Sequence, residues 1–236
     1  MDLVFLGVND VGMRVYEWLR DRDGVHVAAL LTGDEQLDLV RRVEPDLLVS
    51  VGFDHLVPAE ILSVPERGGI NLHPSLLPHN RGKSPNVWSI VDGTPAGVTL
   101  HRMDEEYDTG GIIAQREVDT TFADTGRELH ERLERTQFEL FTDVWPRIET
   151  GDFETEPQSP DAGRFHGVDD FRELCEIHPE EHYTARELLD VLRALTFPPF
   201  DNAYLDVDGE RYYVDVDIRP EDESDETDAE GLLNAY

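Results

Sequence analysis

Asn71 and His73 have the residue types and the spacing of a site that handles a negatively charged oxygen. They stand two positions apart after an apolar segment, and residues two apart on a β-strand project from the same face. From that face an amide can donate a hydrogen bond to an oxyanion, and an imidazole can donate another or move a proton. The alternative is a pair of surface loop residues with no shared role, so the pair needs support from its surroundings.

A third candidate, Asp108, lies in an acidic loop. The loop leaves an apolar segment at Met103, carries Gly110 and Gly111, and returns to apolar sequence at Ile112. Glycines let the backbone come close to a ligand, which favours a binding loop. A hairpin loop with a solvated acidic tip is the other interpretation, because the chain holds 52 acidic residues.

The segments around these residues alternate between β-strands and helices. Apolar runs typical of buried strands are separated by segments with the apolar spacing of helices. The expected strands are residues 3–6, 25–31, 46–51 and 97–103, and the expected helices are residues 13–19, 37–43 and 125–148. This alternation predicts an α/β fold with a doubly wound, mostly parallel sheet that helices cover on both faces.

The turn of residues 7–12, Gly-Val-Asn-Asp-Val-Gly, invites comparison with the fingerprint of dinucleotide-binding proteins. It lacks the middle glycine that lets backbone approach a pyrophosphate, so a nicotinamide cofactor is disfavoured. The N–H groups of the first helical turn could still hold an anion. A plain strand-to-helix turn explains the pattern equally well.

The last third of the sequence has a different character. Residues 185–195 predict a helix, which the Pro-Pro pair at 198–199 ends. Residues 203–214 have the pattern of two strands joined at Asp208-Gly209, a strong hairpin signal. The acidic C-terminal end has too few apolar residues to fold alone. The expected organisation is a main domain at 1–160, a small helix and β-hairpin extension at 161–218, and a disordered acidic tail at 219–236.

The charge balance is strongly acidic. The chain has 52 Asp and Glu against 20 Lys and Arg, a formal net charge of -32, and Lys83 is its only lysine. Carboxylates keep a protein soluble when salt screens their repulsion, whereas in dilute buffer they strain the compact state. We therefore expect a halophilic protein; an ordinary acidic protein would leave the near-absence of lysine unexplained. Nucleic acid is not an expected partner, because its backbone binds through Lys and Arg.

Cysteine content and hydropathy indicate the compartment. Cys175 is the single cysteine, so no disulfide can form within the chain. The first residues, Met-Asp-Leu-Val-Phe-Leu, lack the basic start and long apolar run of a signal peptide. No apolar stretch approaches the ~20 residues that span a bilayer. We expect a soluble, cytoplasmic protein without membrane contacts.

Four motifs lie close together in the middle of the sequence. They are residues 71–78 (Asn-Leu-His-Pro-Ser-Leu-Leu-Pro), 80–82 (Asn-Arg-Gly), 97–104 (Gly-Val-Thr-Leu-His-Arg-Met-Asp) and 107–110 (Tyr-Asp-Thr-Gly). With them the sequence resembles the folate-dependent formyltransferases, the family of glycinamide ribonucleotide, methionyl-tRNA and nucleotide-amino-sugar formyltransferases. The resemblance runs from the first strand to about Trp145 and is most specific over residues 69–115.

The resemblance implies a doubly wound catalytic domain that binds 10-formyltetrahydrofolate beside Asn71, His73 and Asp108. The substrate amine would attack the formyl carbon, while Asn71 and a protonated His73 stabilise the oxyanion. Asp108 would keep His73 charged and, directly or through water, help to move the amine proton to the departing folate nitrogen. The resemblance implies no metal.

The same resemblance implies a pterin pocket. Its residues would be Asp54, His55, Leu56, Val57, Ser75, Leu76, Leu77, Pro78, Asp104, Glu105, Glu106 and Tyr107, with the backbone up to Asp108. Lys83 falls where family members often carry a basic residue near the formyl group or folate, which favours a functional role over a solvated side chain. At Gly110-Gly111 the family commonly has Gly followed by Asp or a similar residue. This departure affects the details of the loop and not the expected chemistry.

The C-terminal region indicates which amine accepts the formyl group. Family members that act on methionyl-tRNA carry a larger, basic C-terminal barrel, and purine-pathway members would end soon after the long helix. The helix and hairpin here are similar to the small C-terminal module of nucleotide-sugar N-formyltransferases, in which hairpins often make a dimer contact. We therefore expect a nucleotide-linked amino sugar as acceptor and a homodimer through the hairpin. A methionyl-tRNA or glycinamide ribonucleotide enzyme, or a non-catalytic folate- or nucleotide-binding protein, are the alternatives.

Overall fold

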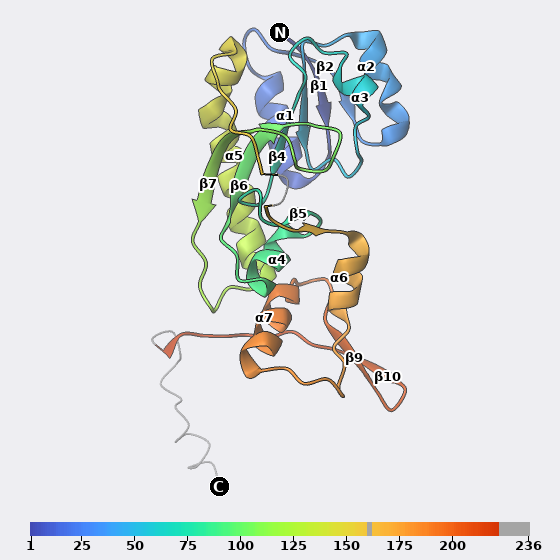
Figure 1. Ribbon diagram of the computed structural model, residues 1–236, viewed down its shortest axis with the longest axis vertical. Coiled ribbons are helices and arrows are strands. Elements are labelled where there is room, and N and C mark those ends of the chain that lie inside the picture. Colours follow the sequence, from blue (N-terminus) through green and yellow to red (C-terminus); the bar gives the residue numbers. More distant parts are fainter. Residues whose placement is uncertain (160–161, 222–236) are drawn as a thin grey trace.

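A six-stranded sheet forms one half of the molecule in the computed structural model, which describes residues 1–159 and 162–221 (Figure 1). The strand order is β2-β1-β3-β4-β6-β7. The strands are β1 (Asp2–Leu6), β2 (His26–Leu31), β3 (Leu47–Val51), β4 (Gly69–His73), β6 (Ala96–Arg102) and β7 (Ile112–Val118). The first four are parallel, whereas β6 is antiparallel to β4 and β7 is antiparallel to β6. The mostly parallel sheet that the sequence predicts is confirmed.

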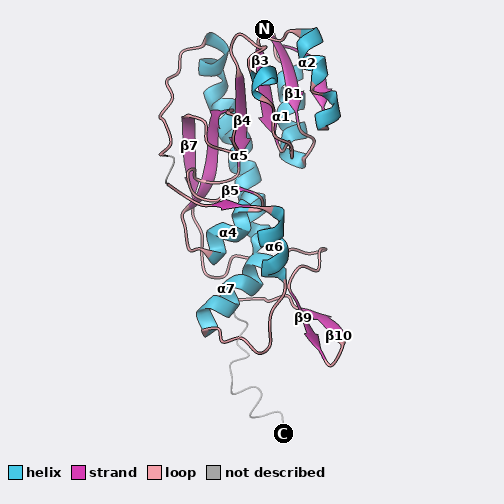
Figure 2. Ribbon diagram, turned by 45° about the vertical axis from the view of Figure 1, so that its right-hand side comes forward, coloured by secondary structure: helices cyan, strands magenta, loops and turns pink. Residues whose placement is uncertain are grey.

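Helices cover both faces of this sheet (Figure 2). They are α1 (Asp10–Arg20) and α5 (Gly126–Thr150) on one face and α2 (Asp38–Val43) and α3 (Ala59–Leu62) on the other, with a short 3-10 helix η1 (Asp34–Gln36) before α2. A further helix, α4 (Pro85–Val91), packs against α5 beyond the end of the sheet. Alternate residues of β1 point to opposite faces. Leu3 and Phe5 therefore join the core under α1 and α5, while Val4 and Leu6 join a second core under α2 and α3. Two cores on one sheet are what a doubly wound fold requires.

Local sequence determines where the helices beside the site begin and end. The Asn9 side chain accepts a hydrogen bond from the N–H of Gly12 at 2.9 Å and starts α1. Thr125 and Glu128 form a capping box at the start of α5, which ends at Gly151 with a φ of 75°. Each side-chain cap stabilises its helix by about 1 kcal/mol. The long α5 packs against β6 and β7 and so supports the middle of the sheet.

The C-terminal module contains the helix and hairpin that the sequence predicts. They are α7 (Ala185–Leu195), β9 (Tyr204–Val207) and β10 (Glu210–Tyr213). Asp208 and Gly209 join the two strands with φ values of 53° and 84°, which suits the twist of a two-residue hairpin. Of the expected acidic tail at 219–236, residues 222–236 lie outside the described residues.

Several short elements were not predicted. Among them are η1, α3, α4, α6 (Val168–Cys175) and the two-stranded sheet of β5 (Arg81–Gly82) and β8 (Phe165–His166). β5 and β8 have two residues each, too few to show any periodicity. α6 has eight residues with Cys175 as its one buried residue, in a segment whose Pro, Asp and Gly content indicated loops. Among residues 1–159 and 162–221, no helix combines the length and the hydropathy needed to cross a membrane.

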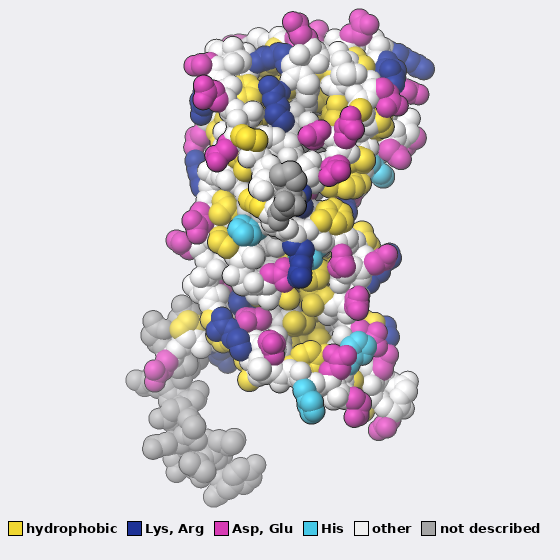
Figure 3. All heavy atoms as spheres, viewed as in Figure 1, with side chains coloured by type: hydrophobic (Ala, Val, Ile, Leu, Met, Phe, Trp, Pro, Cys, Tyr) yellow, Lys and Arg dark blue, Asp and Glu magenta, His cyan; other side chains and the backbone are white. Residues whose placement is uncertain are grey.

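The surface charge leads to a prediction about salt. Acidic side chains are scattered over the face seen in Figure 3, with basic residues between them. Surface ion pairs such as Arg116 with Glu139 and Asp143 weaken in salt, but each contributes only about 0–1 kcal/mol. The net charge of -32 makes repulsion the larger effect. Because the Debye length falls from about 10 Å at ~0.1 M to about 3 Å at ~1 M, we expect the melting temperature to rise over this range of KCl.

Thermal melts at several KCl concentrations test this prediction, with sucrose as the control for effects that do not depend on charge. Any gain above ~1 M must come from ion and water binding at carboxylates or from stronger apolar burial, because screening is then nearly complete. A melting temperature that stays flat or falls between dilute and molar KCl would contradict the halophilic interpretation.

Candidate active site

The predicted catalytic residues come together at the end of β4. Asn71 and His73 lie two residues apart on this strand, and His73 is buried. β6 pairs with β4 in the antiparallel direction, which places His101 directly opposite Asn71. His101 is buried as well, and the sequence analysis did not single it out as a site residue. Its signal was its place in the motif at 97–104, but only the strand register shows that it faces Asn71.

Asp108 reaches this pair from the loop that follows β6. Its Oδ1 atom lies 3.5 Å from Nδ1 of His73, 3.5 Å from Nε2 of His101 and 3.3 Å from the amide nitrogen of Asn71. Its Oδ2 atom accepts a hydrogen bond from the N–H of Gly82 at 2.9 Å. The structure thus brings all three predicted residues into one cluster and adds His101 and the Gly82 N–H to it.

The surroundings of Asp108 keep its carboxyl group ionised. Burial alone would raise the pKa of Asp108, because it disfavours the charged form. The interactions with His73 and His101 and the hydrogen bond from Gly82 outweigh burial and hold the pKa of Asp108 well below its usual range. The carboxylate is therefore a negative charge beside the two imidazole rings at neutral pH.

Burial of His73 disfavours a positive charge on its ring. Burial lowers the pKa of His73 below its ordinary value of 6.5, and the neighbouring His101 lowers it further, against the raising effect of Asp108. Nε2 of His73 lies 3.2 Å from the carbonyl oxygen of Asn80, which can only accept, so Nε2 carries the hydrogen. Nδ1 lies 3.5 Å from Oδ1 of Asp108 and can take up a proton there. The lowered pKa favours a neutral ring, whereas the family resemblance implied a protonated His73, and which form is active stays a prediction.

The direction of this pKa predicts how activity depends on pH. If neutral His73 is the active form, kcat/KM is high above the pKa of His73 and is lost as the pH falls through it. Because burial lowers that pKa below 6.5, we expect kcat/KM to stay level from about pH 8 to about pH 6.5 and to decline only at lower pH. A pH profile of kcat/KM measures this. If kcat/KM instead falls as the pH rises above about 7, His73 acts in its protonated form.

Asn71 is held by the same cluster. Nδ1 of His101 donates to the carbonyl oxygen of Arg102 at 2.7 Å, so in the neutral form of this ring Nε2 is an acceptor. The amide nitrogen of Asn71 lies 3.1 Å from this Nε2 atom and 3.3 Å from Asp108, and each contact uses one of its two hydrogens. Asn71 can therefore donate to an oxyanion only by giving up one of these contacts.

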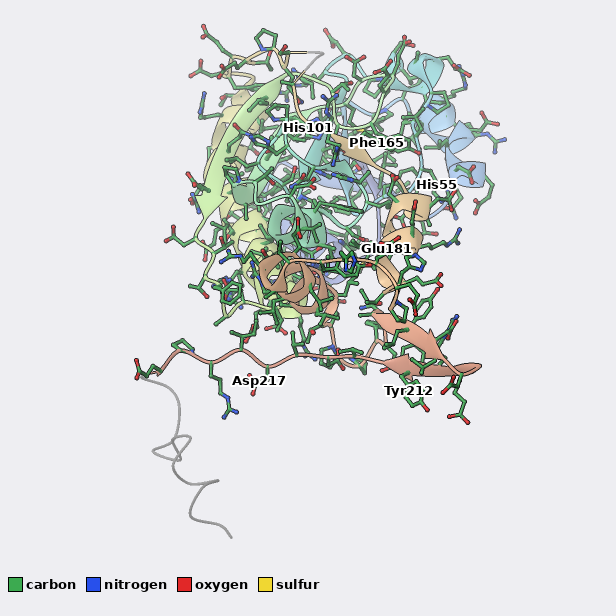
Figure 4. The ribbon with its side chains drawn as sticks, turned by 60° about the horizontal axis from the view of Figure 1, so that its bottom comes forward. His55, His101, Phe165, Glu181, Tyr212 and Asp217 are labelled. Atoms are coloured by element: carbon green, nitrogen blue, oxygen red, sulfur yellow. The ribbon has the colours of Figure 1, made fainter. Side chains whose placement is uncertain are left out.

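A cavity of about 640 Å³ opens beside the cluster, within the range of cavities that bind small molecules. The loop after β3 contributes one group of lining residues, Phe53, Asp54, His55, Leu56 and Val57. The second half of the chain contributes another, His130, Phe165, Phe171, Phe197, Phe200 and Asn202. Figure 4 labels His55, His101 and Phe165 from three different elements of this lining, and Tyr212 on the hairpin, apart from them.

The predicted binding residues divide into two groups. Asp54, His55, Leu56, Val57, Lys83, Asp104, Glu106 and Tyr107 line the cavity, whereas Ser75, Leu76, Leu77, Pro78 and Glu105 do not. Ser75 and Leu77 are buried in a turn that Thr99 holds against β6, through a hydrogen bond of 2.7 Å to the Ser75 carbonyl and one of 3.1 Å from the Leu77 N–H. This turn therefore packs in the interior and does not line the cavity.

Lys83 lies at the cavity as expected and pairs with Asp54. Both side chains are partly exposed, so this ion pair is screened by solvent and contributes little to stability. Lys83 is the only Lys or Arg among the described residues that line the cavity. A negatively charged ligand entering the cavity therefore meets one ammonium group, which can leave Asp54 at little cost.

Comparison with known proteins assigns the family. A formyl transferase family model matches residues 26–145, and a model of the N-formyltransferase dimerization C-terminal domain matches residues 170–220. The GDP-perosamine N-formyltransferase of Brucella melitensis is 32% identical over 212 residues, which cover 86% of this chain and 78% of that protein. The chain belongs to the formyl transferase family. The family resemblance inferred from the four motifs is confirmed.

Solved formyltransferases share the architecture. A sugar N-formyltransferase from Shewanella sp. is 26% identical, with a TM-score of 0.84 and coverage of 93% of this chain and 98% of that chain. The formyltransferase PseJ from Anoxybacillus kamchatkensis, in complex with UDP-4,6-dideoxy-4-formamido-L-AltNAc and tetrahydrofolate, is 33% identical, with a TM-score of 0.65. That alignment covers 73% of this chain and 89% of the PseJ chain. The fold is thus that of a formyltransferase over nearly the whole chain.

Proposed function

We propose that this protein transfers the formyl group of 10-formyltetrahydrofolate to a primary amine on a nucleotide-linked sugar. The observation that carries the proposal is the cluster of Asn71, His73 and Asp108 at the wall of a cavity of about 640 Å³. The relatives named for GDP-perosamine and for sugar N-formylation support the choice of acceptor.

The residues after β3 suit the flat pterin ring of a folate. Phe53, Leu56 and Val57 give this part of the cavity apolar walls, and the carboxylates of Asp104 and Glu106 can accept hydrogen bonds from ring N–H groups. When bound, the formylated folate supplies the formyl carbon that the acceptor amine attacks. Lys83 stands at the same cavity and can meet the negative charge of either ligand.

The chain's own residues then have distinct tasks. Nδ1 of neutral His73 accepts the proton that the amine releases, directly or through water. Asp108 remains ionised and stabilises the imidazolium that forms, because its pKa lies far below neutral pH. Asn71 exchanges one of its present contacts for a hydrogen bond to the developing oxyanion. His73 can return its proton to the nitrogen that loses the formyl group.

The acceptor would bind against the second group of lining residues. Phe165, Phe171, Phe197 and Phe200 offer aromatic surface on which a nucleotide base can stack, and His130 and Asn202 offer polar contacts. This aromatic surface comes from the part of the chain that follows α5, the region that distinguishes this chain from family members that end there. We therefore place the amino sugar between these aromatic residues and His73.

A turnover assay with a panel of amines tests the proposal. Full-length protein is mixed in molar KCl with 10-formyltetrahydrofolate and UDP-, GDP- or dTDP-linked amino sugars, glycinamide ribonucleotide, or methionyl-tRNA. We expect a product heavier by one formyl group, detected by mass spectrometry, with a nucleotide amino sugar and no product with the matching sugar that carries a hydroxyl in place of the amine. Formylation of methionyl-tRNA or glycinamide ribonucleotide instead would overturn the choice of acceptor, and no formylation of any amine would favour a non-catalytic binding protein.

We also propose that the hairpin forms a homodimer contact. The match of residues 170–220 to the dimerization C-terminal domain supports this, and the hairpin exposes Val207, Tyr212 and Tyr213. Light scattering should therefore give the mass of a dimer, and replacing Tyr212 and Tyr213 by serine should shift it to the mass of a monomer. Phe122→Ser, which removes an exposed aromatic side chain elsewhere, is the control and should leave the mass unchanged. Equal masses for all three proteins would show that the hairpin makes no such contact.

A further inference from the structure

The segment between α5 and α6, residues 151–167, lies outside both family models, which match residues 26–145 and 170–220. We call this segment the connector. Its residues 151–159 and 162–167 contact both loops that build the catalytic cluster. β8 of the connector pairs with β5, whose Gly82 donates its N–H to Asp108. Glu156 exchanges two backbone hydrogen bonds of 2.8 Å with Ile112, where the loop that carries Asp108 ends.

Gln158 makes the most direct of these contacts. Its side-chain nitrogen donates to the carbonyl oxygen of Asp108 at 2.9 Å and to that of Gly110 at 2.7 Å. Because both neighbours are carbonyl oxygens, only the NH₂ end of the amide can face them. The Oε1 atom of Gln158 is buried without a partner among the described residues. The side chain therefore keeps an unpaired acceptor while both of its hydrogens hold the loop.

The loop needs such support at this point. Asp108 has a φ of 57°, in the left-handed region that side chains other than glycine rarely adopt. Two residues later, a Cβ atom at Gly110 would lie 2.0 Å from the carbonyl oxygen of Arg102, so the backbone there is tightly packed. Gln158 joins the carbonyl groups on both sides of Thr109 and so fixes the turn that directs the Asp108 carboxylate at His73.

We propose that Gln158 is a positioning residue of the formyl transfer reaction, acting through Asp108. Gln158 sets the backbone of the turn, the turn sets the direction of the carboxylate, and the carboxylate stabilises the charge on His73. The inference rests on the proposed function, in which Asp108 has that task. It also adds Gln158, which neither family model covers, to the residues that shape the active site.

A double-mutant cycle tests this role. Gln158→Met keeps the length and volume of the side chain and removes both hydrogen bonds. We expect it to lower kcat by about 10- to 100-fold, the effect of a small displacement of a catalytic group, with the KM for 10-formyltetrahydrofolate changed by less than about twofold. In the Asp108→Asn background the same substitution should lower kcat by less than about twofold, because residues that act as one unit are not additive. The kcat of Gln158→Asn, whose side chain is one methylene shorter, should fall between the kcat of Gln158→Met and that of the native protein. If Gln158→Met does not fold, Gln158→Asn takes its place in the cycle.

Gln115 provides the matched control. Its side-chain nitrogen also makes two hydrogen bonds, 2.7 Å to the Leu77 carbonyl oxygen and 2.8 Å to Thr99, but none to Asp108. Gln115→Met should lower the melting temperature about as much as Gln158→Met and lower kcat equally in the native and the Asp108→Asn backgrounds. The inference is overturned if Gln158→Met lowers only the melting temperature, or lowers kcat equally in both backgrounds. If Asp108→Asn alone keeps full activity, the proposed function fails instead.

Discussion

His73→Ala is expected to lower kcat by about 100-fold or more, the size of the effect of losing a proton-transfer group. His73 combines a position at the cavity with a ring nitrogen, Nδ1, that faces Asp108, while its Nε2 atom is bound to the carbonyl oxygen of Asn80. The side chain is small and its main hydrogen bond goes to one carbonyl group, so the fold should remain. Steady-state kinetics with the accepted amino sugar, together with a thermal melt, measures both parts of this expectation.

Chemical rescue sharpens the test. His73→Ala leaves a space beside the cavity into which free imidazole can enter, and added imidazole should restore part of the lost rate. His26→Ala, which removes an exposed imidazole from β2, is the control and should change neither the rate nor its response to imidazole. Near-native turnover of purified His73→Ala would remove His73 from the mechanism.

Asp108→Asn is expected to have a similarly large effect for a different reason. The substitution keeps the shape of the side chain and removes the negative charge that stabilises the His73 imidazolium, so we expect kcat to fall by about 100-fold or more. Folate binding should weaken little, because the proposed pterin contacts lie on other side chains. Calorimetric titration with tetrahydrofolate separates the two effects.

Asp124→Asn is the matched control for this charge removal. Asp124 is also a buried, paired carboxylate, since it contacts Arg132 and the N–H of Thr121, but it does not line the cavity. Asp124→Asn should therefore lower stability and leave kcat within about twofold. Loss of folate binding in Asp108→Asn would mean that Asp108 builds the loop and does not act on His73.

The fold could be predicted from the sequence because its strongest signals are local. Buried strands and amphipathic helices follow each other along residues 1–150, and the apolar pattern alone indicates a covered parallel sheet. The pairing of Asn71 with His73 could also be predicted from the sequence, because the two residues share one strand face. Both kinds of signal depend only on residues that are close in the sequence.

The parts of the site that could not be predicted depend on pairing between distant segments. His101 faces Asn71 only through the register of β4 and β6, and Gln158 reaches Asp108 across 50 positions of the chain. The turn at Ser75 to Pro78 was expected at the cavity, but Thr99 on β6 holds it in the interior. Burial lowers the pKa of His73, and a sequence motif does not show burial.

The position of the single lysine has a practical consequence for labelling. Amine-reactive reagents have only two targets in this chain, the N-terminus and Lys83, and the second lies at the cavity. The only thiol, Cys175, is buried, and burial raises the pKa of Cys175, which makes it a poor nucleophile. Protection of Lys83 from an amine-reactive reagent would therefore report directly on ligands that enter the cavity, in the native sequence and without an engineered cysteine.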